Sequence, residues 1–205
     1  METLREKVLA CGIAGHALRG QQVSGDRHLI HPFREGMLIA AVDGLGHGWE
    51  AALAARIAVK TLKRHAGESL PSLVARCQVA LGHTRGVAAS MASFSLADST
   101  MTWLGVGNVE GVLVHSETDR VPGKEFLLLA KGFIGGHLPR LRAFVVPVGT
   151  GATLTFATDG VASDFHEEMN TYEPPQGIAD RILAKHGKDS DDALVLVARL
   201  VGNLK

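Results

Sequence analysis

The sequence is poor in aromatic residues and in cysteine, and it has no excess of charge of either sign. Phe, Trp and Tyr make up 5% of the 205 residues, and the only cysteines are Cys11 and Cys77. They form no CxxC pair and have no His at metal-ligand spacing, so the sequence supports neither a disulfide framework nor a zinc site. Lys plus Arg and Asp plus Glu both number 21. A net charge of zero argues against a nucleic-acid partner, whose binding needs a surplus of positive charge.

Long hydrophobic runs are also missing. The longest apolar stretches, such as residues 37–42 and 193–198, are far shorter than the about 18 residues that a membrane-spanning helix needs. Charged residues fill much of positions 2–7, where a secretion signal would need an apolar segment. We therefore expect a cytoplasmic protein with no membrane partner. No linker or change in composition divides residues 1–205, which predicts a single domain.

Glycine, in contrast, is abundant, with 24 residues. Short runs of Val, Leu, Ile, Ala and Phe, bounded by Gly, Pro or Asp, are typical of β-strands. The sequence predicts strands over 7–14, 36–42, 87–96, 101–106, 111–115, 125–129, 141–146, 153–157 and 193–200. Capping residues, helical spacing and terminal glycines predict helices over 49–65, 69–81 and 175–186. Strands that follow one another directly form antiparallel sheets, so the helices are expected to cover the faces of these sheets.

The most informative segment is residues 38–48, in which an apolar strand ends at Asp43 and the glycine-rich turn Gly-Leu-Gly-His-Gly opens into a helix. One interpretation is a plain structural turn with Asp43 as the helix cap. A second is a dinucleotide-binding turn, but that fingerprint would need glycine in place of Trp49 and a parallel βαβ order afterwards. A third treats Asp43 as a metal ligand, with the glycines letting the Gly44 carbonyl approach the ion.

The metal interpretation predicts more carboxylates beside other strands, because Mg²⁺ and Mn²⁺ prefer oxygen ligands. Asp26 follows Val-Ser-Gly, Asp159 follows a predicted strand, and Asp191 and Asp192 precede the last predicted strand. Any one of these acids alone is compatible with an ordinary turn. Together with Asp43, their order along the chain favours a metal site.

These segments together resemble the metal-dependent Ser/Thr phosphatases of the protein phosphatase 2C type, and more closely the bacterial SpoIIE-like branch. The matching motifs are Ser24-Gly-Asp26, Asp43-Gly-Leu-Gly-His-Gly48, Thr158-Asp-Gly160 and Asp191-Asp192. The Gly-Val-Gly-Asn-Val segment at 105–109 is similar to the stand-alone stress-regulator phosphatases of that branch. The resemblance spans about residues 7–201. It implies an α+β fold, a four-layer αββα sandwich of two antiparallel sheets flanked by helices, which agrees with the predicted order of elements.

The resemblance also implies a centre of two Mn²⁺ or Mg²⁺ ions. By position, Asp43 would bridge both ions, and Asp192 would lie outside the ligand set. The other implied ligands are Asp26 and the Gly44 carbonyl for one ion, and Asp159 and Asp191 for the other. Two such ions activate a water for attack on a phosphate. No nucleophilic side chain is evident, since no G-x-S-x-G elbow occurs.

His47 is the second catalytic candidate, beside Asp43. In eukaryotic members of the family, a His two residues after the bridging Asp is the suspected general acid, but Leu45 stands at that position here. His47 lies two residues further on, and its ring is suited either to protonate the leaving oxygen or to fix the turn by a hydrogen bond.

The eukaryotic members also bind phosphate through an arginine before the first acid, where this chain has Gln21 and Gln22. Arg27 and His28 are then the remaining candidates for a phosphate contact. We interpret His28 and His31 as solvated histidines of a loop. Residues 105–108 fail the dinucleotide spacing, and we expect them to form a hairpin turn.

The motifs and the resemblance together predict a metal-dependent phosphatase that removes phosphate from Ser or Thr of a partner protein. The resemblance implies that these partners are regulatory proteins of a bacterial stress-response, partner-switching or stressosome pathway. Two alternatives stay open: a non-catalytic binding module with the same fold, and a small-molecule phosphatase that uses the same ions. For the phosphoprotein we expect a docking surface over residues 161–175, with Phe165 and Tyr172 exposed.

Overall fold

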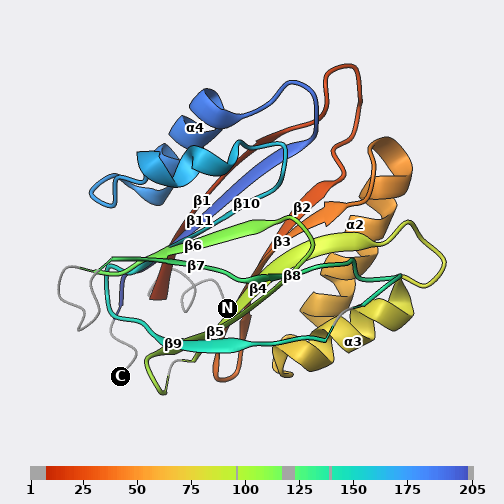
Figure 1. Cartoon of the computed structure of the whole chain (residues 1–205). Coiled ribbons are helices and arrows are strands. Elements are labelled where there is room, and N and C mark those ends of the chain that lie inside the picture. Colours follow the sequence, from red (N-terminus) through yellow and green to blue (C-terminus); the bar gives the residue numbers. More distant parts are fainter. Residues whose placement is uncertain (1–7, 96, 117–122, 139, 203–205) are drawn as a thin grey trace.

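Two β-sheets pack face to face and carry helices on their outer faces (Figure 1). The computed structural model describes residues 8–95, 97–116, 123–138 and 140–202. The first sheet has the order β1 (Leu9–His16), β11 (Ala193–Leu200), β10 (Thr153–Ala157), β6 (Glu110–Val114) and β7 (Lys124–Phe126). The second has the order β2 (Asp26–Phe33), β3 (Gly36–Gly44), β4 (Val87–Ser95), β5 (Thr100–Val106) and β8 (Leu129–Ala130), and β9 (Phe144–Pro147) also pairs with β5. The β5–β8 pair is parallel, and the other pairs are antiparallel.

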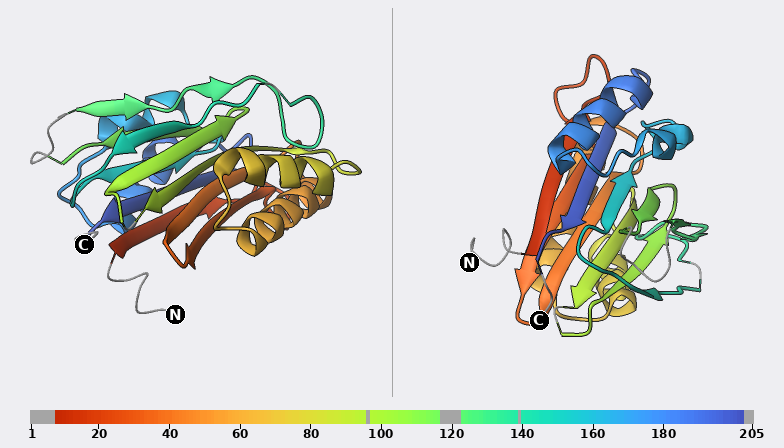
Figure 2. Two further views of the ribbon diagram at one scale, coloured as in Figure 1. Left: turned by 90° about the horizontal axis from the view of Figure 1, so that it is seen from below. Right: turned by 90° about the vertical axis from the view of Figure 1, so that its left-hand side faces the viewer.

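The helices form the two outer layers (Figure 2). α2 (Gly48–Arg64) and α3 (Leu70–Ala80) lie on the second sheet, and α4 (Pro175–His186) lies on the first sheet with the 3₁₀ helix η1 (Ser163–Glu168). α3 begins where Ser69 caps it, since the Ser69 hydroxyl accepts a hydrogen bond from the Ser72 amide. The expected αββα sandwich is confirmed. No helix in the described ranges is long and apolar enough to cross a membrane.

Alternation along β3 explains why this strand is apolar throughout. Leu38, Ala40 and Val42 pack under α2 and α3, whereas Ile39 and Ala41 pack in the core between the two sheets. Successive side chains of a strand point to opposite faces, and here both faces are covered. A third apolar cluster fills the space between the first sheet and α4. The same alternation determines the direction of the Asp43 side chain, near the end of β3.

Most of the predicted elements are confirmed to within two residues. The confirmed strands are those predicted at 36–42, 101–106, 111–115, 153–157 and 193–200, and the confirmed helices are those predicted at 49–65, 69–81 and 175–186. Strand β2 is not among the predictions, and the interpretation of His28 and His31 as loop residues is wrong, because both lie in β2. β2 is an edge strand that mixes charged and apolar residues and contains Pro32. Pro is tolerated at a sheet edge, and β2 takes its conformation from pairing with β3 along its whole length.

Other differences between the predicted and the observed elements occur where the chain passes from one sheet to the other. Residues 105–108 form no hairpin, because β5 belongs to the second sheet and β6 to the first. The predicted strand 125–129 divides into β7 and β8, again in different sheets. The predicted strand 141–146 corresponds to β9, which begins later, at Phe144. Residues 7 and 96, at the ends of two predicted strands, lie outside the described residues.

The expected exposure of Phe165 is wrong. Its side chain is 1% exposed and packs in the third cluster with Ile178 and Ile182 of α4. The tight turn of η1 directs this ring inward, whereas Tyr172, in the loop after η1, is 82% exposed. An aromatic docking surface over residues 161–175 therefore has only Tyr172 to offer.

This placement predicts opposite outcomes for two aromatic substitutions. Phe165→Ala should lower the free energy of unfolding by about 3–5 kcal/mol, because it leaves a cavity under α4. Tyr172→Ala, the matched exposed change, should alter it by less than about 0.5 kcal/mol. Urea denaturation followed by circular dichroism measures both, and equal losses would contradict the buried position of Phe165.

Candidate metal centre

Two buried aspartates face each other across β2 and β3. The antiparallel register pairs Asp26 directly with Asp43, a position in which Cβ atoms lie about 5 Å apart. Both side chains point between the sheets, because Ile30 of β2 and Ile39 of β3, an even number of residues away, pack there. Asp26 is 5% exposed and Asp43 is 9% exposed. Two carboxylates this close and this buried repel each other, so they need either protons or a cation.

Glycines shape the turn that joins Asp43 to α2. Gly46 and Gly48 have φ angles of +87° and +74°, in the left-handed region that residues with a Cβ rarely adopt. A Cβ on Gly44 would lie 2.1 Å from the Ala51 carbonyl oxygen, so the end of β3 runs against the first turn of α2. The Gly44 amide donates to the Gly25 carbonyl at 3.3 Å. The turn is thereby tied to the residue that precedes Asp26.

Three further aspartates come from the first sheet. Asp159 follows β10, and Asp191 and Asp192 precede β11, the antiparallel neighbour of β10. Their carboxylates are near enough to raise the pKa of both Asp26 and Asp43. Within the described ranges, however, no three His, Cys, Asp or Glu side chains are arranged so that they could hold one ion. The structure thus brings the predicted acids to one place without forming a three-carboxylate cage.

The electrostatics of the site follow from this crowding. Burial first, and then the neighbouring carboxylates, raise the pKa of Asp43 to about 8. Burial also raises the pKa of Asp26 to about 7, against a hydrogen bond from Thr158 that lowers it. The pKa of Asp159 is raised by burial and by Asp191, and lowered by a hydrogen bond from Asn108. The metal-free site therefore holds protons that ordinary carboxylates would have lost.

Thr158 connects the two sheets at the site, a role that the sequence analysis missed. Its hydroxyl donates to Asp26 Oδ2 at 2.7 Å and accepts a hydrogen bond from the Leu194 amide at 2.8 Å. Asp26 Oδ1 is buried and has no hydrogen-bond partner among the described atoms. The only signal of this role in the sequence was the position of Thr158, directly after a buried strand and before Asp159.

Asp192 holds the loop that leads into β2. Its Oδ1 accepts from the Leu18 amide and its Oδ2 from the Gly25 amide, each at 2.8 Å. Both oxygens are thus engaged by the backbone. Asp191 is half-buried, and its Oδ1 accepts from the Asp192 amide at 2.8 Å. The two adjacent acids have different surroundings, and Asp192 is the one committed to the backbone.

Asn108 and Lys188 hold Asp159, and the sequence analysis assigned neither. Asn108 Nδ2 donates to Asp159 Oδ2 at 2.5 Å, and Lys188 Nζ donates to the Asp159 carbonyl at 2.7 Å. Asn108 lies in the crossing from β5 to β6, which brings it to the end of β10. The signal available in the sequence was that Asn108 belongs to the 105–109 motif. The sequence analysis interpreted residues 105–108 as a hairpin turn instead.

The remaining candidates lie at the rim of the site. His47 is the exposed residue before α2, and its Nδ1 lies 3.5 Å from Gln21 Nε2. Arg27 Nη1 donates to the Ser24 and Asp26 carbonyls at 3.1 and 2.8 Å, so this guanidinium is bound to its own loop. His28 is exposed on β2. Of these side chains, only His47 lies on the glycine-rich turn itself.

These residues fit a divalent cation. Asp26 Oδ1 is a buried oxygen with no hydrogen-bond donor in the part of the chain that the structure describes, and the raised pKa values mean that a cation would replace protons. Mg²⁺ usually keeps several waters and takes one or two carboxylates. A hydrated ion on Asp26, Asp43 and the Gly44 carbonyl therefore requires no three-carboxylate cage.

Comparisons with known proteins agree with this description. A family model described as Stage II sporulation protein E (SpoIIE) matches residues 34–201. The chain belongs to the SpoIIE family. This SpoIIE-family chain is 24% identical over 184 residues to the phosphoserine phosphatase RsbX of Bacillus subtilis (strain 168), a match that covers 88% of this chain and 89% of RsbX.

Solved structures share the fold of this SpoIIE-family chain. A structure of RsbX in complex with magnesium is 20% identical, with a TM-score of 0.83 over 95% of this chain and 96% of RsbX. A chain from work on the bacterial stressosome as a modular system adapted to control secondary messenger signaling is 26% identical, with a TM-score of 0.85 over 93% of this chain and 99% of that one. The Mycobacterium tuberculosis serine/threonine phosphatase PstP/Ppp is 15% identical, with a TM-score of 0.76 over 95% of this chain and 99% of that one.

Substitution of two acids should change the stability of the metal-free protein in opposite directions. At about pH 8.5, Asp43→Asn should raise the free energy of unfolding, because it removes one of two facing buried charges. Asp192→Asn should lower it by about 1–3 kcal/mol, because the Leu18 and Gly25 amides lose a charged acceptor. Urea denaturation in EDTA tests both variants, and changes of the same sign would contradict these assignments.

The metal-free protein should also lose stability between about pH 4 and about pH 8. Asp26 and Asp43 have folded-state pKa values of about 7 and about 8, above the ordinary value of 3.8. The folded state then binds more protons than the unfolded state, and stability that is fully present below about pH 4 is lost as the pH rises through 7 to 8. Melting temperatures in EDTA should fall across this window, and Asp43→Asn should flatten the slope. An identical slope in wild type and variant would refute the proton-binding role of this acid.

Proposed function

We propose that this chain is a divalent-metal-dependent phosphatase that acts on phosphoserine or phosphothreonine of regulatory proteins in a bacterial stress-response, partner-switching or stressosome pathway. The observation that carries the proposal is the pairing of Asp26 with Asp43 inside the sandwich, where Asp26 Oδ1 is buried and has no hydrogen-bond partner among the residues described. A binding module has no need for facing buried carboxylates, which destabilise a fold unless a cation joins them. Membership of the SpoIIE family and the similarity to RsbX support the choice of substrate.

In the proposed site, Asp43 would serve as a ligand for both of two Mg²⁺ or Mn²⁺ ions. Asp26 and the Gly44 carbonyl would hold one ion, and Asp159 and Asp191 would hold the other. When bound, two such ions supply an activated water and neutralise the charge on the phosphate oxygens. Phosphoryl transfer depends mainly on positioning and charge stabilisation, so none of these side chains has to attack the phosphorus.

The other residues of the site position these ligands. The Thr158 hydroxyl orients Asp26, and the Asn108 amide orients Asp159. Asp192 fixes the loop that carries Asp26. His47 lies at the rim, where its ring is placed either to protonate the leaving Ser or Thr oxygen or to hold Gln21 against the turn. In this arrangement, residues from both sheets orient the reacting groups.

Metal removal gives the direct test. EDTA should abolish hydrolysis of a phosphorylated regulator and of p-nitrophenyl phosphate, and Mn²⁺ or Mg²⁺ should restore it. Zn²⁺ should not be the preferred ion, because the site has no Cys or His ligand. Asp43→Asn should lower kcat/KM by roughly 100-fold or more at saturating Mn²⁺, with a smaller loss for Asp192→Asn. Full activity in chelator would refute the metal mechanism.

A comparison of substrates separates the alternatives. The phosphorylated regulator should give a higher kcat/KM than free nucleotides or p-nitrophenyl phosphate. A preference for nucleotides would identify a small-molecule phosphatase. Binding of the regulator with no hydrolysis of any substrate, with Mn²⁺ present, would identify a non-catalytic binding module.

A further inference from the structure

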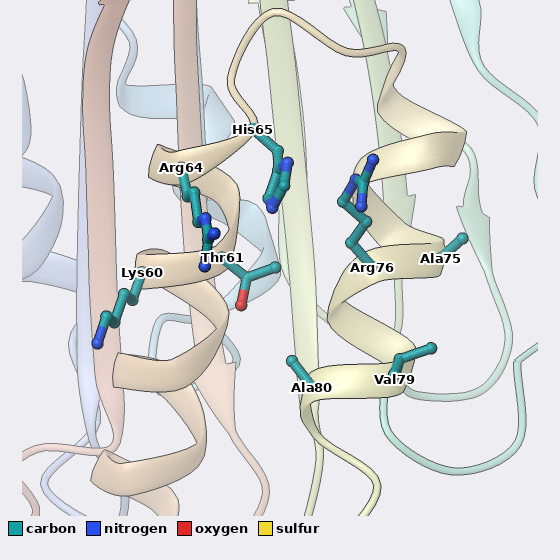
Figure 3. A pocket seen from close by; sticks show the side chains of 8 residues that line it. All are labelled: Lys60, Thr61, Arg64, His65, Ala75, Arg76, Val79 and Ala80. Carbon is teal, nitrogen blue, oxygen red and sulfur yellow. The ribbon is translucent and has the colours of Figure 1, made fainter.

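A groove lies between α2 and α3 (Figure 3). Its volume is about 490 Å³. The end of α2 contributes Lys60 and Arg64, the C-cap residue His65 follows, and α3 contributes Arg76, Val79 and Ala80. A second hollow of about 410 Å³ shares Arg64 and His65 with this groove. The two hollows thus meet around the C-terminal end of α2.

The groove is positively charged in a chain of zero net charge. Residues 48–80 contain five Lys or Arg and two Glu. The one acid beside the groove, Glu68, is already paired with Arg76 at 2.7 Å and with His65 at 3.0 Å. Lys60, Arg64 and Lys63, which lines the second hollow, form no ion pair within the described part of the chain. Three cationic side chains therefore stand without a counter-charge around the two adjoining hollows.

Apart from Arg76, which is paired with Glu68, the wall formed by α3 is apolar. Val79 is 83% exposed, and Ala75 and Ala80 lie beside it. The residues that α3 buries, such as Leu73 and Cys77, face the second sheet instead. Val79 therefore contributes nothing to the core, and a partner that covered it would remove an aliphatic side chain from water.

We infer that this groove binds an acidic segment of a partner protein that places an aliphatic side chain against Val79. Carboxylates of the segment would face Lys60, Lys63 and Arg64, and complementary charge of this kind fixes register and partner choice. A nucleic acid matches less well, because its backbone offers no aliphatic side chain to Val79 and the chain as a whole carries no positive surplus.

The inference goes beyond the proposed phosphatase activity. Gly48 and Lys60 are separated by about 18 Å of helix, at 1.5 Å per residue, so the groove forms no part of the metal centre. A partner bound there leaves the approach to Asp43 open. Binding at the groove and hydrolysis at the metal centre are therefore separate properties that can be measured independently.

Fluorescence anisotropy with the full chain tests the inference. The probe is a labelled synthetic peptide of alternating Glu and Leu, compared with a Lys and Leu peptide and a single-stranded oligonucleotide. The Glu peptide should bind, and the double variant Lys60→Glu/Arg64→Glu should weaken binding by about tenfold or more. Val79→Ser should weaken it by about threefold or more. The control Arg56→Glu/Lys131→Glu makes the same change in net charge with exposed residues outside both hollows, and it should change binding by less than about twofold.

Three results would overturn the inference: no binding of the Glu peptide, equal weakening by the control variant, or oligonucleotide binding that depends on Lys60 and Arg64 in the same way. All variants should keep the circular dichroism of the wild type and its Mn²⁺-dependent hydrolysis of p-nitrophenyl phosphate. Peptide binding in a protein that hydrolyses nothing would overturn the phosphatase proposal and leave the groove assignment standing. The two failures are thus distinguishable.

Discussion

Repulsion between two facing carboxylates is the constraint on which this site depends. The β2–β3 register sets Asp26 against Asp43, and the alternation of side chains directs both into the space between the sheets. The apolar clusters on both sides of the second sheet keep this arrangement rigid, so the two acids cannot relieve their repulsion by moving apart. The repulsion is then relieved only by a bound proton or a bound cation. A metal-dependent phosphatase uses such a site to bind its cation in place of the proton.

Residues from both sheets hold these aspartates in place. Asp26 belongs to the second sheet but receives its hydrogen bond from Thr158, next to the first sheet. The loop before Asp26 is held by Asp192, again from the first sheet. The positions of these aspartates therefore depend on the packing of both sheets and not on one sheet alone. A loss of packing between the sheets would separate the aspartates even if every residue were retained.

Prediction from sequence succeeded where the signal is local. β3 is buried on both faces and reads as one apolar run, so the strand and the acid at its end were recognisable. β2 was not, because an edge strand of mixed composition owes its conformation to its neighbour. The Thr158–Asp26 and Asn108–Asp159 hydrogen bonds join residues 132 and 51 positions apart, and no periodicity reports such contacts. Phe165 was misjudged because the 3₁₀ segment that turns it inward is short and has weak periodicity.

The small residues of α2 determine how freely this chain can diverge. The helix rests on the second sheet through Ala51, Ala54, Ala55 and Ala58, all essentially inaccessible to solvent, and Gly44 runs against its first turn. A larger side chain at any of these four positions would push the first turns of α2 away from the sheet, and the glycine-rich turn would move with them. Leu62, near the C-terminal end of α2, is the large buried residue of this face. The outer face of the same helix meets no such limit. Substitutions should therefore accumulate on the outer side of α2 while these four positions stay alanine, so that the outer surface can change while the turn that carries Asp43 keeps its place.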